Sequence, residues 1–331
     1  MDTGSGAVSL PSIQARLLSP ALSSTSGRRG SSAAGSSGAG RICARLLLAA
    51  LFVRLVASAS WATEIPVFIF AGQSEAINSG TDTGLMKPEA LAPQPNVLFY
   101  NARTHAPATG AVHWVTYRPP TGPGFMDCGH TNAQGSFGPE ITAANLISRR
   151  CYSGEPVGVF KYAVGATDLW NQWNPNRPGF YPDVLSCLSN AMAALPRETR
   201  HRGRIAGVFW TQGESDALAG TSTAAAYGTN LQNFVLALRR HLGEPRLPFV
   251  YGRILPQWQN SQGVRDGQQA LANRLPNAFM VNADDLLTPT LHYDNEGTMT
   301  LGNRYAEGFV ALMGSRAGAT NRLDNAGRSQ K

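Results

Sequence analysis

Short apolar runs alternate with longer amphipathic stretches along most of this chain, from Ile65 onward. The run Ile65–Ala71 (IPVFIFA) is apolar without interruption and ends at Gly72, a pattern typical of a strand buried on both faces. Strand–helix alternation builds βαβ units, so the sequence predicts an α/β fold with a parallel sheet between layers of helices. The predicted strands are Ile65–Ala71, Val97–Tyr100, Pro156–Ala163, Ile205–Trp210, Phe249–Ile254 and Ala278–Val281. The predicted helices are Pro139–Arg150, Pro182–Leu195, Thr223–His241, Val264–Leu275 and Thr298–Met313.

The first 62 residues are expected to form a leader outside the fold. Residues 1–40 are rich in Ser, Gly and Ala and show no periodicity. Arg41 and Arg45 then precede the apolar run Leu46–Ala57, which ends in small residues as a secretory signal peptide does. We therefore expect cleavage near Ala62 and a secreted or periplasmic protein; a transit peptide is the alternative, because the leader is rich in Arg and Ser. The folded domain is predicted over residues 63–314 and a disordered tail over residues 315–331.

The positive charge of the chain belongs mainly to this leader. The formal net charge is +7, but residues 1–63 hold six arginines and one acid, which leaves about +2 for the remainder. A nearly neutral domain argues against nucleic-acid binding. The apolar run of the leader is shorter than the ~20 residues of a membrane span, so no membrane association beyond export is expected. Cys128, Cys151 and Cys187 would remain after cleavage, which allows at most one disulfide, and their spacing fits no metal motif.

Polar motifs follow three predicted strands at their carboxyl ends, where open parallel sheets bind ligands. The first, Gly72-Gln73-Ser74, places a serine on a tight strand-to-helix turn, which exposes its hydroxyl and orients backbone N–H groups. Taken alone, such a serine is equally well explained as a helix cap. The other two are V-G-A-T-D-L-W at 164–170 and W-T-Q-G-E-S-D at 210–216, and L-H-Y-D at 291–294 puts His292 just before the last helix. Together these motifs favour an active site.

With F-G-P-E at 137–140, the set resembles the sialate O-acetylesterase-like group of SGNH hydrolases, which includes acetylxylan esterases of carbohydrate esterase family six. The motifs stand in family order from Val67 to about Met313, and W-T-Q-G-E-S-D is the most specific of them. The resemblance implies a flavodoxin-like three-layer α/β/α fold with a central parallel sheet. It also implies a serine esterase that removes acetyl groups from sugars through an acyl-enzyme.

The resemblance assigns roles to individual residues. Ser74 matches the family's nucleophile and His292 its general base. The oxyanion of the reaction would be held by the backbone N–H groups of Ser74 and Gly165 and by the side-chain amide of Gln212. Such chemistry needs no metal and no cofactor, and the expected partner is an acetylated oligo- or polysaccharide.

The chain departs from the family pattern at three positions. Glu75 stands where the family reads Asn in G-Q-S-N, and a carboxylate there is expected to disfavour anionic substrates and to disturb local hydrogen bonds. Ala166 stands at the second glycine of the family's G-G-T turn, where it keeps the backbone donor but lacks glycine's freedom at positive φ. Pro289 stands three residues before His292, where the family places the aspartate that orients the histidine.

Another carboxylate must then orient His292. Glu214 is the favoured candidate, because some relatives use this glutamate as the acid and it lies at the predicted active edge. Asp284 and Asp285 are the alternatives, although Asp285 could reach His292 only if the intervening loop folds back. The remaining possibility is that no acid is left and the enzyme is weak.

Two other functions stay open. A general short-chain esterase or lipase would share the same catalytic residues, and a catalytically weak sugar-binding protein would fit the replacements at Glu75 and Pro289. Trp114, Trp170 and Trp173 could stack on sugar rings near the site, but tryptophans buried in a core would give the same pattern.

Overall fold

The structure is a computed structural model, and it describes residues 63–77, 80–103, 113–120, 126–127, 130–131, 135–286, 288 and 291–328. The predicted leader and Pro289 lie outside these residues. The strands are β1 (Glu64–Gly72), β2 (Gln94–Arg103), β3 (Val115–Tyr117), β4 (Met126–Asp127), β5 (His130–Thr131), β6 (Val157–Ala163), β7 (Arg202–Thr211), β8 (Phe249–Gly252) and β9 (Ala278–Val281). The helices are α2 (Ser74–Ile77), α3 (Glu140–Cys151), α4 (Phe180–Thr199), α5 (Glu214–Leu218), α6 (Thr221–His241), α7 (Ser261–Arg274) and α8 (Asn295–Arg328), with short 3₁₀ turns at Thr83–Leu85 and Pro88–Leu91.

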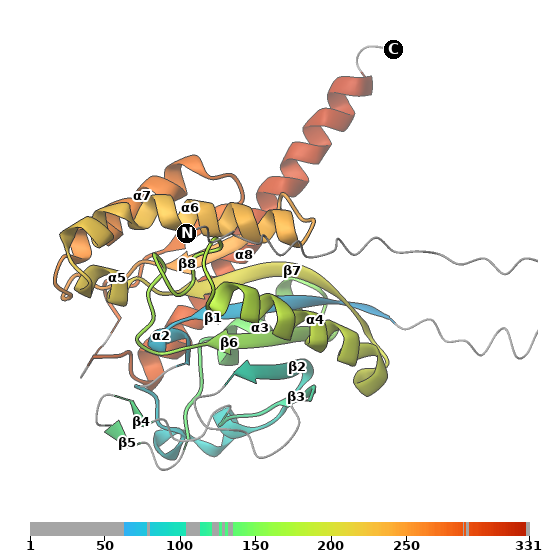
Figure 1. Cartoon of the computed structure of the whole chain (residues 1–331). Helices are drawn as coiled ribbons and strands as arrows, with labels where there is room; N and C mark the ends of the chain where they lie inside the picture. The colour runs from blue at the N-terminus through green and yellow to red at the C-terminus, as the bar shows by residue number, and fades with distance from the viewer. Residues whose placement is uncertain are drawn as a thin grey trace, which may run out of the picture. The chain divides into compact units, whose positions relative to one another are not determined.

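A seven-stranded sheet in the order β3-β2-β6-β1-β7-β8-β9 forms the centre of the fold (Figure 1). All neighbouring strands in it run parallel except β2 and β3. β1 pairs with β6 on one side and β7 on the other, and every residue of β1 after Glu64 is buried. This central position explains why the run Ile65–Ala71 has no polar interruption. The mostly parallel sheet confirms the predicted fold class.

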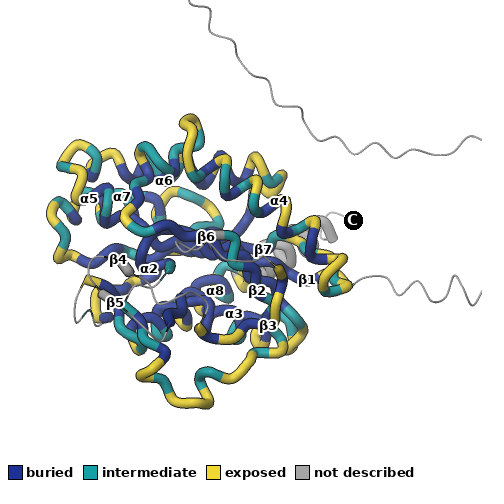
Figure 2. Tube along the Cα trace, turned by 60° about the horizontal axis from the view of Figure 1, so that its bottom comes forward, coloured by how far each residue is buried: buried dark blue, intermediate teal, exposed yellow. Residues whose placement is uncertain are grey.

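Helices cover both faces of this sheet, which gives the three predicted layers. Figure 2 shows α4, α5, α6 and α7 on one side and α3 and α8 on the other. Side chains of β1 alternate between the two cores, because successive residues of a strand point to opposite faces. Ile65, Val67 and Ile69 pack with Leu188 of α4 and Leu231 of α6. Phe68 and Phe70 pack with Ile141 of α3 and Phe309 of α8.

The predicted strands and long helices are all present, with ends shifted by a few residues. One difference is β3, which is not among the predicted strands. It is an edge strand of three residues with one buried side chain, too short to give a periodic signal. α8 runs to Arg328, so it continues past its expected end at Met313 into the segment predicted as a disordered tail. Cys151 and Cys187 carry free thiols, while Cys128 lies outside the described residues. Among the described helices, none combines the length and the apolar character needed to cross a membrane.

Candidate active site

The three central strands end at the same level. Gly72 of β1 stands in register with Ala163 of β6 and Thr211 of β7. The backbone continues this alignment past the strands, because the Gln73 N–H donates to the Thr211 carbonyl (2.9 Å) and the Val164 N–H to the Gly72 carbonyl (3.0 Å). Gly72 has φ 141°, and a Cβ there would lie 2.0 Å from the Thr211 oxygen, so only glycine fits. The three predicted motifs therefore leave the sheet side by side.

Ser74 is the first residue of α2, on the turn directly after β1. The carbonyl of Gln73 accepts the N–H groups of Ala76 (2.9 Å) and Ile77 (3.1 Å), which closes the turn around Ser74. The side-chain oxygen of Gln73 accepts the N–H groups of Gly213 and Ser215, each at 3.4 Å, and so joins this turn to the start of α5. α2 and α5 lie at the same end of the sheet (Figure 1). The strand-to-helix turn predicted for the serine is present.

The turn that carries Gly165 is held in an unusual backbone conformation. Ala166 has φ 55°, the left-handed region that the family's glycine reaches without strain and alanine adopts at a cost of about 1–2 kcal/mol. The hydroxyl of Thr167 donates to the Val164 carbonyl (2.7 Å) and accepts the indole N–H of Trp173 (2.9 Å). The two hydrogen bonds of Thr167 offset this strain, so the turn forms with Ala166 in place of the family's glycine.

Asp216 and Gln212 fasten the same turn to the end of β7. The Asp216 carboxylate accepts the backbone N–H groups of Leu169 (2.8 Å) and Trp170 (3.2 Å). Burial raises the pKa of Asp216 to about 6. Gln212 is fully buried, and its amide nitrogen donates to the Thr167 carbonyl (3.0 Å) and to Asp216. In this arrangement Gln212 builds the turn that presents Gly165, and donation from Gln212 to an oxyanion stays a prediction.

The segment after α2 packs against the histidine loop. A Cβ on Gly80 would lie 2.2 Å from the Tyr293 carbonyl oxygen and 2.8 Å from the His292 Cβ, so the chain passes close to both residues. The Asp82 N–H donates to the side-chain oxygen of Asn295, and the Asn295 amide donates to the Asp82 carbonyl, both at 2.8 Å. His292 is itself buried, with 7% of its surface exposed. Residues 80–82 and the start of α8 are thereby held together.

Glu75 makes a second connection between these segments. It is 2% exposed, and its Oε2 accepts the Tyr293 N–H at 3.3 Å. Burial, strengthened by the charge of Glu214, raises the pKa of Glu75 well above its ordinary value. The side chain therefore accepts a hydrogen bond where the histidine loop meets α2, and the expectation that Glu75 disturbs local hydrogen bonds stays a prediction.

Glu214 opens α5 and is 5% exposed. Burial raises its pKa to about 7, and the neighbouring Asp216 charge acts in the same direction. Its charge also raises the pKa of Glu75 and of Tyr293. Within the described part of the chain its Oε2 is buried without a hydrogen-bond partner. The pairing of Glu214 with His292 stays a prediction.

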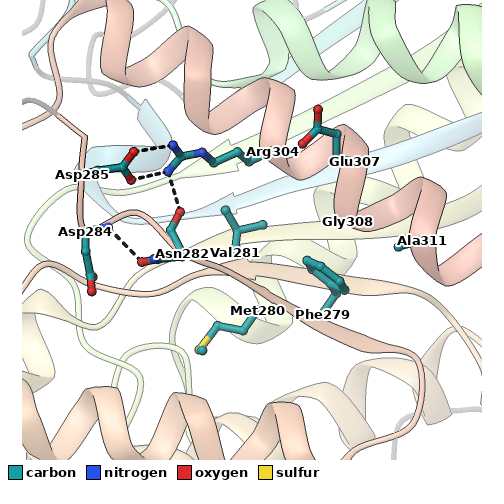
Figure 3. Close-up of a pocket in the computed structure, with 10 residues that line it drawn as sticks. All are labelled: Phe279, Met280, Val281, Asn282, Asp284, Asp285, Arg304, Glu307, Gly308 and Ala311. Carbon is teal, nitrogen blue, oxygen red and sulfur yellow. Dashed lines mark hydrogen bonds and ion pairs between the residues drawn. The ribbon is translucent and has the colours of Figure 1, made fainter.

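Asp284 and Asp285, the alternative acids, line a separate hollow of about 840 Å³ between β9 and α8 (Figure 3). Asp285 pairs with Arg304 at 2.6 Å, and Asp284 pairs with Arg253 and, at 2.8 Å, with Arg265. Hydrogen bonding to these arginines lowers the pKa of both carboxyl groups. Both aspartates are thus already paired with arginines in the hollow between β9 and α8. None of the other predicted site residues lines this hollow.

The three candidate sugar-stacking tryptophans differ in exposure. Trp173 is fully buried and Trp114 is 6% exposed, so both belong to the core. Trp170 is 39% exposed and follows the Gly165 turn, with the guanidinium of Arg177 lying 5.3 Å from its ring centroid. Of these three rings, Trp170 is the one that can meet a substrate.

The chain is similar to a known protein family and to solved structures. The family described as carbohydrate esterase, sialic acid-specific acetylesterase matches residues 64–311. A protein of Arabidopsis thaliana named as a probable carbohydrate esterase is 29% identical over 178 residues, which span 53% of this chain and 64% of that protein. A solved structure of an Arabidopsis thaliana protein has a TM-score of 0.60 at 24% identity and covers 76% of this chain and 98% of its own. The structure of NanS has a TM-score of 0.54 at 18% identity, with 77% and 99% covered. The two structures confirm the fold.

Proposed function

The chain belongs to the carbohydrate esterase, sialic acid-specific acetylesterase family, and we propose that it removes O-acetyl groups from a carbohydrate with Ser74 as its nucleophile. One observation carries the proposal. The ends of β1, β6 and β7 stand in register and place the Ser74 turn, the Gly165 turn and Glu214 at one edge of the sheet. The Glu75–Tyr293 contact adds His292 to the same edge. A nucleophile, a base and fixed N–H donors are the parts that acyl transfer requires.

In the proposed reaction the Ser74 hydroxyl attacks the carbonyl carbon of the acetyl ester while His292 takes its proton. The negative charge on the carbonyl oxygen is stabilised by the N–H groups of Ser74 and Gly165, each worth about 3–4 kcal/mol in comparable sites. The side-chain amide of Gln212 is a third donor if it gives up its hydrogen bonds to the Thr167 carbonyl and to Asp216. The sugar oxygen then leaves with the proton held by His292. Water attacks the acetyl-serine by the same route, which releases acetate and restores the hydroxyl.

We further propose that Glu214 accepts the Nδ1–H of His292 during this reaction. A buried carboxylate oxygen without a hydrogen-bond partner is rare in folded proteins, and it marks an acceptor available to a nearby donor. The alternative acids support the choice by exclusion, because Asp284 and Asp285 are held by arginines. An ionised partner favours the imidazolium that forms when Ser74 gives up its proton.

The proposed function is tested by comparing four substrates: an acetylated xylan, an O-acetylated sialic acid, and chromogenic acetate and butyrate esters. We expect hydrolysis of acetate esters and release of acetate from at least one of the two carbohydrates. An organophosphate should leave an adduct on Ser74 that mass spectrometry detects. Equal rates on acetate and butyrate without release from either sugar would indicate a general esterase. Sugar binding without hydrolysis or adduct would indicate a binding protein.

Replacement of Trp170 by alanine is expected to weaken binding of the sugar rather than catalysis. Aromatic contacts of this kind contribute about 0.5–1.5 kcal/mol, so KM for the carbohydrate should rise roughly 2- to 10-fold. KM for the small chromogenic acetate should not change, because that substrate does not reach a sugar-binding ring. Phe279→Ala is the matched control, since Phe279 is 36% exposed but lines the distant hollow at β9. An unchanged KM for the carbohydrate would show that Trp170 does not contact it.

A further inference from the structure

Building on the proposed function, we propose that Glu75 is a positioning residue that fixes the His292 loop relative to Ser74. The residue directly follows Ser74, and Tyr293 directly follows His292. Their contact of 3.3 Å joins positions 218 residues apart in the chain. Both partners are 2% exposed, so the hydrogen bond is shielded from competing water.

The contact sets a distance on which the reaction depends. Proton transfer from Ser74 to His292 needs the two side chains within hydrogen-bond reach, and a displacement of about 1 Å can lower the rate about 100-fold. Ser74 is fixed by its own turn on β1. His292 lies on the loop that precedes α8. The side chain of Glu75 supplies a direct bond from α2 to that loop.

Burial favours the neutral form of Glu75. Two groups that can carry negative charge, Glu214 and Tyr293, interact electrostatically with it. Burial and the Glu214 charge both raise its pKa. A neutral carboxyl group still accepts the Tyr293 N–H through its oxygen.

Substitutions at Glu75 test whether the residue acts through its hydrogen bond to Tyr293 or through a charge. Glu75→Gln keeps the shape and an acceptor oxygen, so kcat with chromogenic acetate should stay within about threefold of the unaltered chain and its pH profile should not move. Glu75→Ala removes the contact and should lower kcat at least about 10-fold with KM within about twofold. Glu75→Asp, shorter by one methylene, should also lower kcat and replaces the alanine variant if that does not fold. Thr142→Ala is the control, because it removes a 2.7 Å hydrogen bond to the Met299 carbonyl of α8 away from the site.

A second readout does not depend on activity. The Tyr293 amide should exchange its hydrogen slowly in the unaltered chain and in Glu75→Gln, and at least about 10-fold faster in Glu75→Ala. If the unaltered chain hydrolyses none of the substrates, the proposed function fails, while amide exchange still tests the contact. A folded Glu75→Ala variant with unchanged kcat would overturn the positioning role. A loss of kcat in Glu75→Gln equal to that in Glu75→Ala would overturn the role of the acceptor oxygen.

Discussion

Ser74→Ala is expected to abolish ester hydrolysis and to leave the protein folded. The hydroxyl forms the covalent bond in the proposed reaction, and its loss in comparable enzymes lowers kcat by factors of about 10⁴–10⁶. The turn itself does not depend on the hydroxyl, because the backbone of Gln73 closes it with Ala76 and Ile77. The kcat with chromogenic acetate and the thermal unfolding temperature are the two measurements.

Ser215→Ala is the matched control for this substitution. Ser215 lies at the same edge of the sheet, and its contact with Gln73 is made by its backbone N–H, which does not depend on the side chain. The control should therefore keep its activity within about threefold. Unchanged turnover by a folded Ser74→Ala variant would remove Ser74 from the mechanism, and with it the proposed class of reaction.

The position of the site could be predicted from the sequence because it depends on strand ends. Apolar runs such as Ile65–Ala71 identify buried strands, and the carboxyl ends of parallel strands meet at one edge of the sheet. Gly72, Ala163 and Thr211 do stand in register there. The residues that come directly after these strands, Ser74 among them, are therefore located at the sheet edge by the sequence pattern alone.

The contacts within the site could not be predicted in the same way. Asp216 belongs to the W-T-Q-G-E-S-D motif, but its bonds to the Leu169 and Trp170 N–H groups depend on how two loops pack, which no periodicity encodes. Likewise, Gln212 donates inside the turn rather than to an open position. A polar residue at a strand end thus predicts participation in the site, while its partner depends on the tertiary structure.

Glu214→Gln is expected to lower kcat by about 10³–10⁴-fold with little change in KM, by analogy with the acids of catalytic triads. The amide carries no negative charge to stabilise the imidazolium of His292. Asp285→Asn is the matched control and should leave kcat nearly unchanged, because Asp285 pairs with Arg304 in the hollow between β9 and α8. The opposite ranking would mean that the Asp285 loop supplies the acid. If neither substitution exceeds about tenfold, no carboxylate orients His292 strongly.

The raised pKa of Glu214 predicts how the activity of the unaltered enzyme depends on pH. Burial raises that pKa to about 7 from an ordinary value of 4.5, and the ionised form is the one that supports His292. The activity of the unaltered enzyme should therefore fall as the pH drops through about 7. Measurement of kcat between pH 5 and 9 tests this, and a rate that is flat across pH 7 would show that the Glu214 charge is not required.

Stability should change with pH in the opposite direction. The folded state holds the Glu214 proton more tightly than the unfolded chain, so its contribution to the free energy of unfolding is full below pH 4.5 and declines as the pH rises through about 7. The decline corresponds to about 3 kcal/mol at 1.36 kcal/mol per pKa unit. Glutamine has no charge to bury, so Glu214→Gln should unfold at a higher temperature than the unaltered chain at pH 8 and at a similar temperature at pH 5. A variant that loses activity and gains stability at pH 8 would show that the buried Glu214 carboxylate supports catalysis but lowers the stability of the fold. A variant that loses both would instead show that the Glu214 charge already has a stabilising partner in the resting protein.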